Sequence, residues 1–193
     1  EDVSHCLFGV KRQIKKMESF TFCDDFEIHI GGDKNFRDDL LLPTKYKSNR
    51  KDNVKPTHLS DAKQYLISKY KAKVAQNQEA DDVINIRGYE ELHKGNLPIL
   101  GVNDKDHNQS SGLTIYNWTE KQPKLYEIPT IGSLSIEGQE VKGDGLKFFA
   151  FQLLFGDPTD GYKPSELTGT RFGKKSAYKL LDNLYEPDEI LSA

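Results

Sequence analysis

The 193-residue sequence has few cysteines and no long apolar run. Its two cysteines, Cys6 and Cys23, exclude a scaffold of several disulfides and favour a reducing compartment. No window approaches the roughly 18 apolar residues that a membrane span requires. The first residues also lack the basic segment and cleavage motif of a signal peptide. We therefore expect a cytoplasmic protein that contacts no membrane.

Histidine is also sparse, and the five histidines form no closely spaced pair. This spacing excludes the ligand pattern typical of zinc sites. Internal repeats and low-complexity tracts are lacking as well. The chain is long enough to form a single domain, residues 1–193, with a core that needs no disulfide or structural metal. Charged residues make up 30% of the chain, but ten Phe and nine Tyr argue against disorder.

The net charge of -3 hides an uneven distribution. Residues 43–75 hold nine basic and two acidic residues, a net charge of +7. The remaining residues hold 18 basic and 28 acidic ones, a net charge of -10. Taken alone, a lysine-rich run is most often a solvated helix surface. On an acidic body, it predicts one face for a polyanion and another for cations.

The spacing of apolar residues predicts helices that alternate with strands. Helical spacing covers residues 3–17, 59–70, 79–91, 146–155 and 174–184. Strand alternation covers residues 26–30, 97–102 and 113–118, with a short strand at 74–75. Asp2 is expected to cap the first helix, and Gly31-Gly32 to end the first strand. This order predicts an α/β fold with a largely parallel central sheet flanked by helices.

Acidic residues gather at the predicted ends of these elements. Asp33 follows the first strand, and Asp104 and Asp106 follow the strand at 97–102, where parallel sheets bind ligands. An extended backbone would point Asp104 and Asp106 the same way. Each group alone is typical of a helix cap or a turn. Further acids lie in the sequences EADD and GDPTDG, namely Glu79, Asp81, Asp82, Asp157 and Asp160.

Converging carboxylates repel one another, so such a cluster is unfavourable unless cations occupy it. Ligation by oxygen alone suits Mg²⁺ or Mn²⁺. Two such ions, roughly 3.5–4 Å apart, are a common device for hydrolysing phosphodiesters. The basic segment at 43–75 then gives a reason to expect a polyanionic substrate.

Five short motifs occur in an order that resembles the structure-specific 5′-nucleases. These are the flap endonucleases and 5′→3′ exonucleases of bacteriophages and of bacterial DNA polymerase I. The motifs are GDKNFR (32–37), YKSNR (46–50), EADD (79–82), DKDHNQ (104–109) and FQLLFGDPTDG (151–161). The small size and irregular spacing resemble a bacteriophage enzyme more than a cellular one. The resemblance implies a monomeric hydrolase that cuts branched or tailed DNA near its 5′ ends, in phage replication or primer removal.

The resemblance also implies roles for the residues that match the motifs. The family binds two Mg²⁺ or Mn²⁺ ions. Its acids at the first metal site correspond to Asp33, Glu79, Asp81 and Asp82 of this chain. Its acids at the second correspond to Asp104, Asp106, Asp157 and Asp160. Lys47 and Arg50 match the basic pair that contacts the scissile phosphate. Residues 43–75 match the helical arch over the single-stranded 5′ end, where Lys45, Tyr46 and Lys51 are expected to contact DNA.

Residues 148–182 match the helix–three-turn–helix that holds duplex DNA, often around a K⁺ ion. DNA contacts are expected there from Arg171, Gly173, Lys174 and Lys175. The first helix of this segment is expected to bury one apolar face, formed by Phe148, Phe149, Leu153 and Leu154.

Two features depart from the family pattern. The family turn, which reads Gly-apolar-Gly, is Arg171-Phe172-Gly173 in this chain. The family also begins with an apolar strand that ends in a metal-binding aspartate, and no such strand precedes the helix at 3–17. Three explanations remain open: an N-terminus that the chain has lost, a separate peptide that supplies the strand, or a degenerate relative.

Two other functions fit part of the pattern. Haloacid dehalogenase-type phosphatases use Asp-x-Asp and a late Gly-Asp-x-x-x-Asp, which DKD and GDPTDG imitate. That interpretation leaves YKSNR, EADD and the basic segment without a role. A DNA-binding relative that keeps the fold without the chemistry fits the missing first aspartate.

Overall fold

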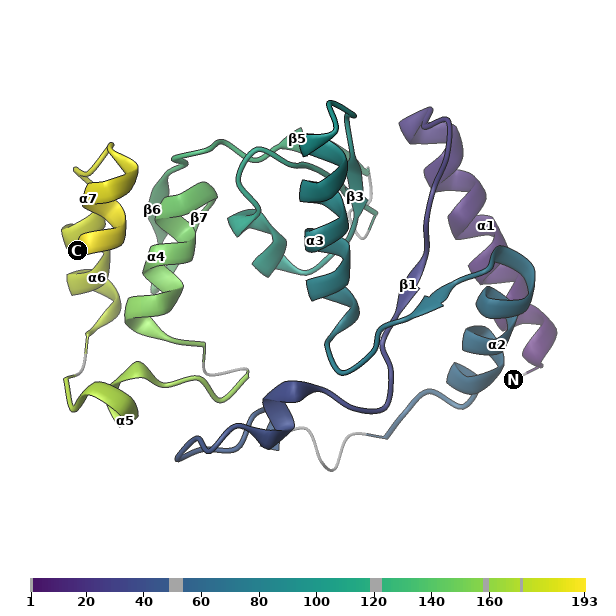
Figure 1. The fold of residues 1–193 in the computed structure, drawn as a ribbon, viewed down its shortest axis with the longest axis horizontal. Helices are drawn as coiled ribbons and strands as arrows, with labels where there is room; N and C mark the ends of the chain where they lie inside the picture. Colours follow the sequence, from purple (N-terminus) through teal and green to yellow (C-terminus); the bar gives the residue numbers. More distant parts are fainter. Residues whose placement is uncertain (1, 49–53, 119–122, 158–159, 171) are drawn as a thin grey trace.

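A computed structural model describes residues 2–48, 54–118, 123–157, 160–170 and 172–193, and it confirms the mixed α/β class. Helices α1 and α2 lie at one end of the molecule and α6 and α7 at the other, with α3 and β3 between them (Figure 1). In chain order the elements are α1 (Val3–Thr21), β1 (His29–Ile30), η1 (Phe36–Asp39), α2 (Leu59–Tyr70), β2 (Lys73–Val74), α3 (Ala80–His93), β3 (Ile99–Gly101), η3 (Lys105–Gln109), β4 (Thr114–Asn117), β5 (Lys124–Glu127), β6 (Leu134–Glu137), β7 (Glu140–Gly143), α4 (Gly145–Phe155), α5 (Pro164–Thr168), α6 (Lys174–Leu181) and α7 (Pro187–Ser192).

The predicted start of α1 is confirmed in detail. Asp2 has extended backbone angles, and its Oδ1 accepts the backbone N–H of Ser4 over 3.0 Å. This bond satisfies one of the amides that the first turn of a helix leaves unpaired. The helix ends at Phe22, which adopts the left-handed conformation and donates its N–H to Glu18.

The described strands lie in three small sheets. β1 and β2 form a parallel pair, and β3 pairs in parallel with β4, which pairs antiparallel with β5. β6 and β7 form an antiparallel hairpin. The sequence pattern missed this hairpin, although Gly138, with a φ of 62°, supplies a recognisable turn between its strands.

Two hydrophobic cores lie in the second half of the chain. α3 covers β3 closely, because a Cβ on Gly88 would lie 2.8 Å from Leu100 Cδ1. The core beneath α3 consists of Leu100, Val102, Leu113, Ile115 and Ile128. The other core packs α4 against α6, α7 and the hairpin, and consists of Leu134, Phe148, Ala150, Phe151, Ala177, Leu181 and Ile190.

The N-terminal part of the fold has no such core. Among the described residues from 2 to 71, none is fully buried. α1 packs on α2 and reaches the β3–β4 sheet, where Phe20 contacts Tyr116 with ring centroids 5.1 Å apart. Parallel strands are normally buried on both faces, yet Val74 of β2 is 39% exposed. The β1–β2 pair therefore lacks the cover that parallel pairing usually has.

The prediction of which face of α4 is buried was partly wrong. Phe148 is buried, but Phe149 and Leu153 are 37% and 46% exposed. Phe151 is buried in their place, with its ring stacked 6.5 Å from that of Phe148. Because apolar residues lie on almost every side of α4, their spacing does not indicate which face is buried.

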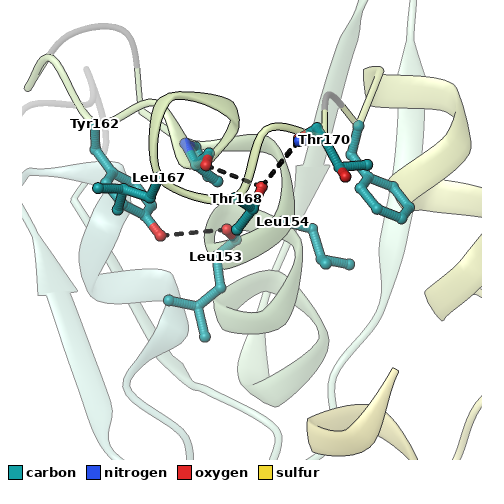
Figure 2. A pocket seen from close by; sticks show the side chains of 8 residues that line it. Leu153, Leu154, Tyr162, Leu167, Thr168 and Thr170 are labelled. Atoms are coloured by element: carbon teal, nitrogen blue, oxygen red, sulfur yellow. Dashed lines mark hydrogen bonds between the residues drawn. The ribbon is translucent and has the colours of Figure 1, made fainter. Parts of the chain in front are cut away.

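The partly exposed side of α4 borders a cavity of about 300 Å³ (Figure 2). This cavity lies between α4, α5 and the segment that leads to α6. Its polar groups are largely paired: the Tyr162 hydroxyl donates to the Leu153 carbonyl, and Thr168 bonds to the backbone of Thr170. The lining residues are Leu153, Leu154, Tyr162, Pro164, Leu167, Thr168, Thr170 and Phe172.

Candidate functional site

Three distant segments meet at the Tyr46 hydroxyl. Its oxygen lies 2.9 Å from Glu79 Oε2, at the start of α3, and 3.0 Å from Asp160 Oδ2, in the GDPTDG loop. Burial and the two carboxylates raise the pKa of Tyr46 well above its ordinary value. The hydroxyl therefore stays protonated and shares its hydrogen between two acids. We call Tyr46, Lys47, Glu79 and Asp160 the Tyr46 junction.

Lys47 supplies the positive charge of the Tyr46 junction. Its Nζ lies 2.6 Å from Glu79 Oε1 and 3.8 Å from Asp160 Oδ2. Its backbone N–H donates to the Asp160 carbonyl over 3.1 Å, and its φ of 48° is left-handed. That conformation is uncommon for a non-glycine residue, although Phe22 also adopts it at the end of α1. The ammonium thus lies between two carboxylates, where a metal cation would also be attracted.

Asp82 is already paired with a cation. Its two carboxylate oxygens accept Arg37 NH1 and NH2 over 2.6 and 2.8 Å. Asp82 Oδ2 also accepts the backbone N–H of Glu79 over 3.0 Å. Burial raises the pKa of Asp82, but the bonds from Arg37 and Glu79 outweigh it, so this pKa is lowered. In this conformation Asp82 therefore anchors the start of α3 to the segment after β1.

A second group of acids lies beside η3 and the end of α4. Burial raises the pKa of Asp106, and the nearby charges of Asp104 and Asp157 raise it further. Gln152 of α4 donates Nε2 to Asp106 Oδ1 over 2.8 Å and partly offsets these effects. We call Asp104, Asp106 and Asp157 the Asp106 group. The negative charges of Asp104 and Asp157 disfavour the ionised form of Asp106, and a cation nearby would relieve this repulsion.

The local backbone of the Asp106 group differs from the prediction. An extended segment was expected at DKD, but η3 begins there, with Asp104 as its N-cap. Asp104 Oδ1 accepts the backbone N–H of Asp106 over 3.1 Å. The capped turn is favoured over an extended backbone because the Asp104 side chain bonds to an amide that the first turn leaves unpaired. The two carboxylates are brought together by a turn.

Asp81 lies between the two groups. Its Oδ1 is 3.4 Å from Nε2 of His107, in η3, and the positive charge of Lys47 also favours its ionised form. The hydrogen bond with His107 lowers the pKa of Asp81 and outweighs the opposite effect of burial. His107 is itself 2% exposed, whereas the Asp81 side chain is 58% exposed.

The remaining predicted metal and phosphate contacts are scattered. Asp33 is exposed in the bend after β1 and takes part in none of the contacts described above. Arg50, Lys51 and Arg171 lie outside the described residues. Within the described ranges, no three His, Cys, Asp or Glu side chains are arranged so as to hold a metal ion. Protein donors, namely Tyr46, Lys47, Arg37 and His107, occupy part of the carboxylate surface instead.

The described residues that were expected to contact DNA lie at the start of α6, for the duplex, and between η1 and α2, for the arch. Gly173 is the N-cap of α6, and Lys175 in its first turn is exposed. Lys174 Nζ lies 3.3 Å from the Gln139 carbonyl oxygen and 5.4 Å from the Phe155 ring centroid, so the ammonium of this lysine contacts other parts of the protein. Lys45, beside the Tyr46 junction, is exposed.

Sequence reasoning missed three side chains of this region. Arg37 lies in the quoted GDKNFR motif, but its partner Asp82 was assigned to a metal. Gln152 and His107 lie in the quoted motifs FQLLFGDPTDG and DKDHNQ without an assigned role. A polar residue within the strongly apolar run of α4 was the available signal for Gln152.

No family model, no curated protein and no solved structure matches the chain. No helix among the described residues is long and apolar enough to span a membrane.

Proposed function

We propose that this chain is a metal-dependent nuclease of the 5′-nuclease type, acting on DNA with a single-stranded 5′ end or flap. The observation that carries the proposal is the Tyr46 junction. It joins the basic segment, the EADD motif and the GDPTDG loop through contacts of 2.6–3.0 Å between side chains. Three motifs quoted for the resemblance are therefore neighbours in space, although they are far apart in the sequence.

The chemistry of the candidate ligands suits Mg²⁺ or Mn²⁺, although their arrangement in the described residues forms no closed metal site. All the candidate ligands are carboxylates, and the pKa of Asp106 is raised first by burial and then by repulsion from Asp104 and Asp157. The Asp106 group would hold one ion, and Asp81 and Glu79 would contribute to the other. Asp160, which was expected at the site of the Asp106 group, shares the Tyr46 hydroxyl with Glu79 and would contribute beside it. Bound there, such ions supply an activated water and neutralise charge on a phosphodiester.

Lys47 is suited to act on the phosphate. In the free protein its ammonium pairs with Glu79 and Asp160, and its side chain is 24% exposed. A cation that binds these acids would compete with Lys47 and release its ammonium toward the substrate. A cation aimed at developing phosphate charge stabilises the transition state more than the ground state. Arg50 is proposed to share this role.

The C-terminal helices are proposed to hold the duplex. α4 and α6 pack on a common core, and the start of α6 presents Gly173 and Lys175 at the surface. Amides at a helix N-terminus and exposed lysines contact phosphates without reading sequence. By the resemblance, residues 148–182 are proposed to act as a helix–three-turn–helix that holds the duplex around a K⁺ ion.

A separate strand-forming peptide is the proposed partner of the N-terminal part. α3 packs on both β1 and β3, but these strands belong to different sheets. A parallel strand between β1 and β3 would join their two sheets into the expected central sheet. It would also cover apolar side chains that are only half-buried without it. Among the described residues, His29 Nδ1 and Gln13 Nε2 are buried with no hydrogen-bond partner, which supports an incomplete environment there.

Adding a synthetic peptide to the chain tests whether it needs this partner. A synthetic apolar strand that ends in aspartate should raise the Tm of the chain by binding the folded form. It should also accelerate Mn²⁺-dependent DNA hydrolysis, whereas a peptide of the same composition in scrambled order should do neither. Intact-mass spectrometry reports any peptide that co-purifies. Ordinary enzymatic turnover by a sample with a single mass would contradict the need for a partner.

A DNA-binding protein without catalysis is the second candidate. The observation that favours it is the Lys47 ammonium between Glu79 and Asp160, which neutralises these acids without a metal. A binding assay and a cleavage assay on one 5′-tailed duplex separate the two functions. The nuclease requires Mn²⁺ for cleavage and is inhibited by EDTA. Binding that is unchanged by EDTA, with intact DNA throughout, would favour the second candidate.

A further inference from the structure

Strands β1 and β3 each have one edge with no neighbour among the described strands. On its other edge each strand is paired in parallel, β1 with β2 and β3 with β4. Helix α3 connects β2 to β3 along the chain and packs on both β1 and β3. A helix in this position normally connects parallel strands of the same sheet. The connection therefore favours one larger sheet, with a further strand between β1 and β3.

Helices cover both faces of the sheet at this position. In β3, Leu100 faces α3, so the next residue, Gly101, faces the opposite side. Helix α1 lies close to that side, because a Cβ on Gly101 would lie 2.5 Å from Met17 Cε. Just after β1, Lys63 of α2 donates to the carbonyl of Gly31 over 2.7 Å. A parallel strand that is covered on both faces is normally apolar along its length.

One buried polar atom of β1 breaks this apolar pattern. The His29 side chain is 6% exposed, and its Nε2 lies 3.1 Å from Glu27 Oε2. Hydrogen bonds from Lys73, and then from Arg87 and His29, hold the pKa of Glu27 at about 2, although burial opposes them. An ionised carboxylate only accepts hydrogen bonds, so Nε2 is the donor. The other ring nitrogen, Nδ1, is buried and has no hydrogen-bond partner among the described residues.

An added strand would bring a side chain to His29. Neighbouring strands lie roughly 4.8 Å apart, so a side chain of the added strand on the same face would lie beside the imidazole. A hydroxyl there pairs with Nδ1 in either state of the ring, since it donates to a neutral imidazole and accepts from a charged one. Threonine is the favoured carrier of this hydroxyl, because β-branched side chains suit strands.

We propose that the partner strand lies parallel between β1 and β3 and is apolar up to its terminal aspartate, except for one threonine whose hydroxyl bonds to His29 Nδ1. This inference rests on the proposed strand-forming partner, and it requires no metal ion. The threonine fixes the register of the partner, since a shift by one residue would turn the hydroxyl to the other face of the sheet. His29 is then a specificity-determining residue for the partner.

A set of labelled peptides tests this register. Each peptide is an apolar strand of about six residues that ends in aspartate, with one valine replaced by threonine at successive positions. Valine and threonine have nearly the same shape, so each peptide differs from the all-valine parent by one hydroxyl. Threonine at one position should strengthen binding by about fivefold through its hydrogen bond to a buried acceptor. Fluorescence anisotropy in EDTA measures the affinities.

Two variants of His29 identify the nitrogen that makes the contact. His29→Asn keeps a polar group near the place of Nδ1, whereas His29→Gln keeps one near the place of Nε2. The preference for threonine should remain in His29→Asn and disappear in His29→Gln. His93→Gln, at an exposed position of α3, is the control and should leave the preference unchanged. The same preference in both His29 variants would overturn the contact with Nδ1.

The remaining outcomes separate this inference from the proposed partner. Peptide binding without a preferred position for threonine would overturn the role of His29 alone. If no peptide binds, the strand-forming partner and the role of His29 fall together. A dimer in light scattering that the peptides do not dissociate would show that a second copy of the chain occupies these edges, and would also overturn the proposal.

Nuclear magnetic resonance of the wild-type chain keeps the test valid if the His29 variants do not fold. The preferred threonine peptide should shift the ¹⁵N resonance of His29 Nδ1 relative to the all-valine peptide. The resonances of exposed His93 should be the same with both peptides. Identical His29 resonances with the two peptides would overturn the proposal.

Discussion

The backbone N–H of Lys47 donates to the carbonyl of Asp160 over 3.1 Å, and the two side chains also approach to 3.8 Å. A backbone bond and an ion pair between the same two residues fix the basic segment to the GDPTDG loop. The left-handed φ of Lys47 is the conformation in which both contacts form. The segment with the most positive charge is therefore held at the acids of the candidate site.

Asp106→Asn should stabilise the metal-free protein at neutral pH. Burial and the charges of Asp104 and Asp157 raise the folded-state pKa of Asp106. Its charge then destabilises the folded state as pH rises from the unfolded pKa through the folded one. The gain in Tm should disappear in acid, where the carboxyl is protonated in both states.

The same variant should lose much of the Tm increase that millimolar Mn²⁺ gives to the wild type. Thermal unfolding with and without Mn²⁺ measures both effects. Asp24→Asn, at an exposed position outside the site, is the control. A variant with lower metal-free Tm and an undiminished Mn²⁺ response would contradict repulsion within the Asp106 group.

Arg37→Met should reduce the free energy of unfolding by about 1–3 kcal/mol at neutral pH, since it removes two hydrogen bonds from a partly buried carboxylate. The pKa of Asp82 is lowered in the folded state, so this contribution is complete above the unfolded pKa of about 3.9. It should be lost as pH falls through the folded pKa. Urea denaturation across this range measures it.

Arg12→Ala, at an exposed position of α1, serves as the control for general loss of positive charge. Equal small losses for both arginine variants at every pH would count against the Arg37–Asp82 anchor.

Lys47→Ala should reduce DNA cleavage more than DNA binding, because its charge is directed at the reacting phosphate. Lys45→Ala, at the exposed neighbouring lysine, should weaken binding mildly and leave the cleavage rate of bound DNA nearly unchanged. Binding of both variants should fall steeply with salt through counterion release. Single-turnover rates and binding constants, measured on one 5′-tailed duplex, separate these effects. Pure and equal binding losses would indicate a general basic surface.

Much of the local structure could be predicted because its signals are local. Asp2 caps α1, and Gly31-Gly32 follow β1, as composition and spacing indicated. The convergence of acids depends on long-range contacts and on residues whose partners lie elsewhere in the chain. Nothing in the sequence assigns Arg37 to Asp82 or Gln152 to Asp106. The buried face of α4 was not predictable either, since polar residues normally mark the exposed side and α4 has few.

Lys175→Glu should weaken binding to duplex DNA while leaving single-stranded binding nearly unchanged. Lys175 is exposed in the first turn of α6, whereas Lys174 leans on the Phe155 ring and the Gln139 carbonyl. Lys179→Glu, near the other end of the same helix, should have a smaller effect. Fluorescence anisotropy with both kinds of DNA measures the difference. A parallel loss on both substrates would remove α6 from the duplex-binding surface.

Cleavage of a 5′-tailed duplex at enzyme concentrations that saturate the DNA tests the central claim most directly. The chain alone should release the tail slowly in Mn²⁺, and the reaction should stop with EDTA or with Asp157→Asn. Asp144→Asn, which changes an acid of the α4 N-cap outside the site, should leave the rate unchanged. DNA that stays intact in Mn²⁺ under these conditions, with and without the strand-forming peptide, would contradict the nuclease function.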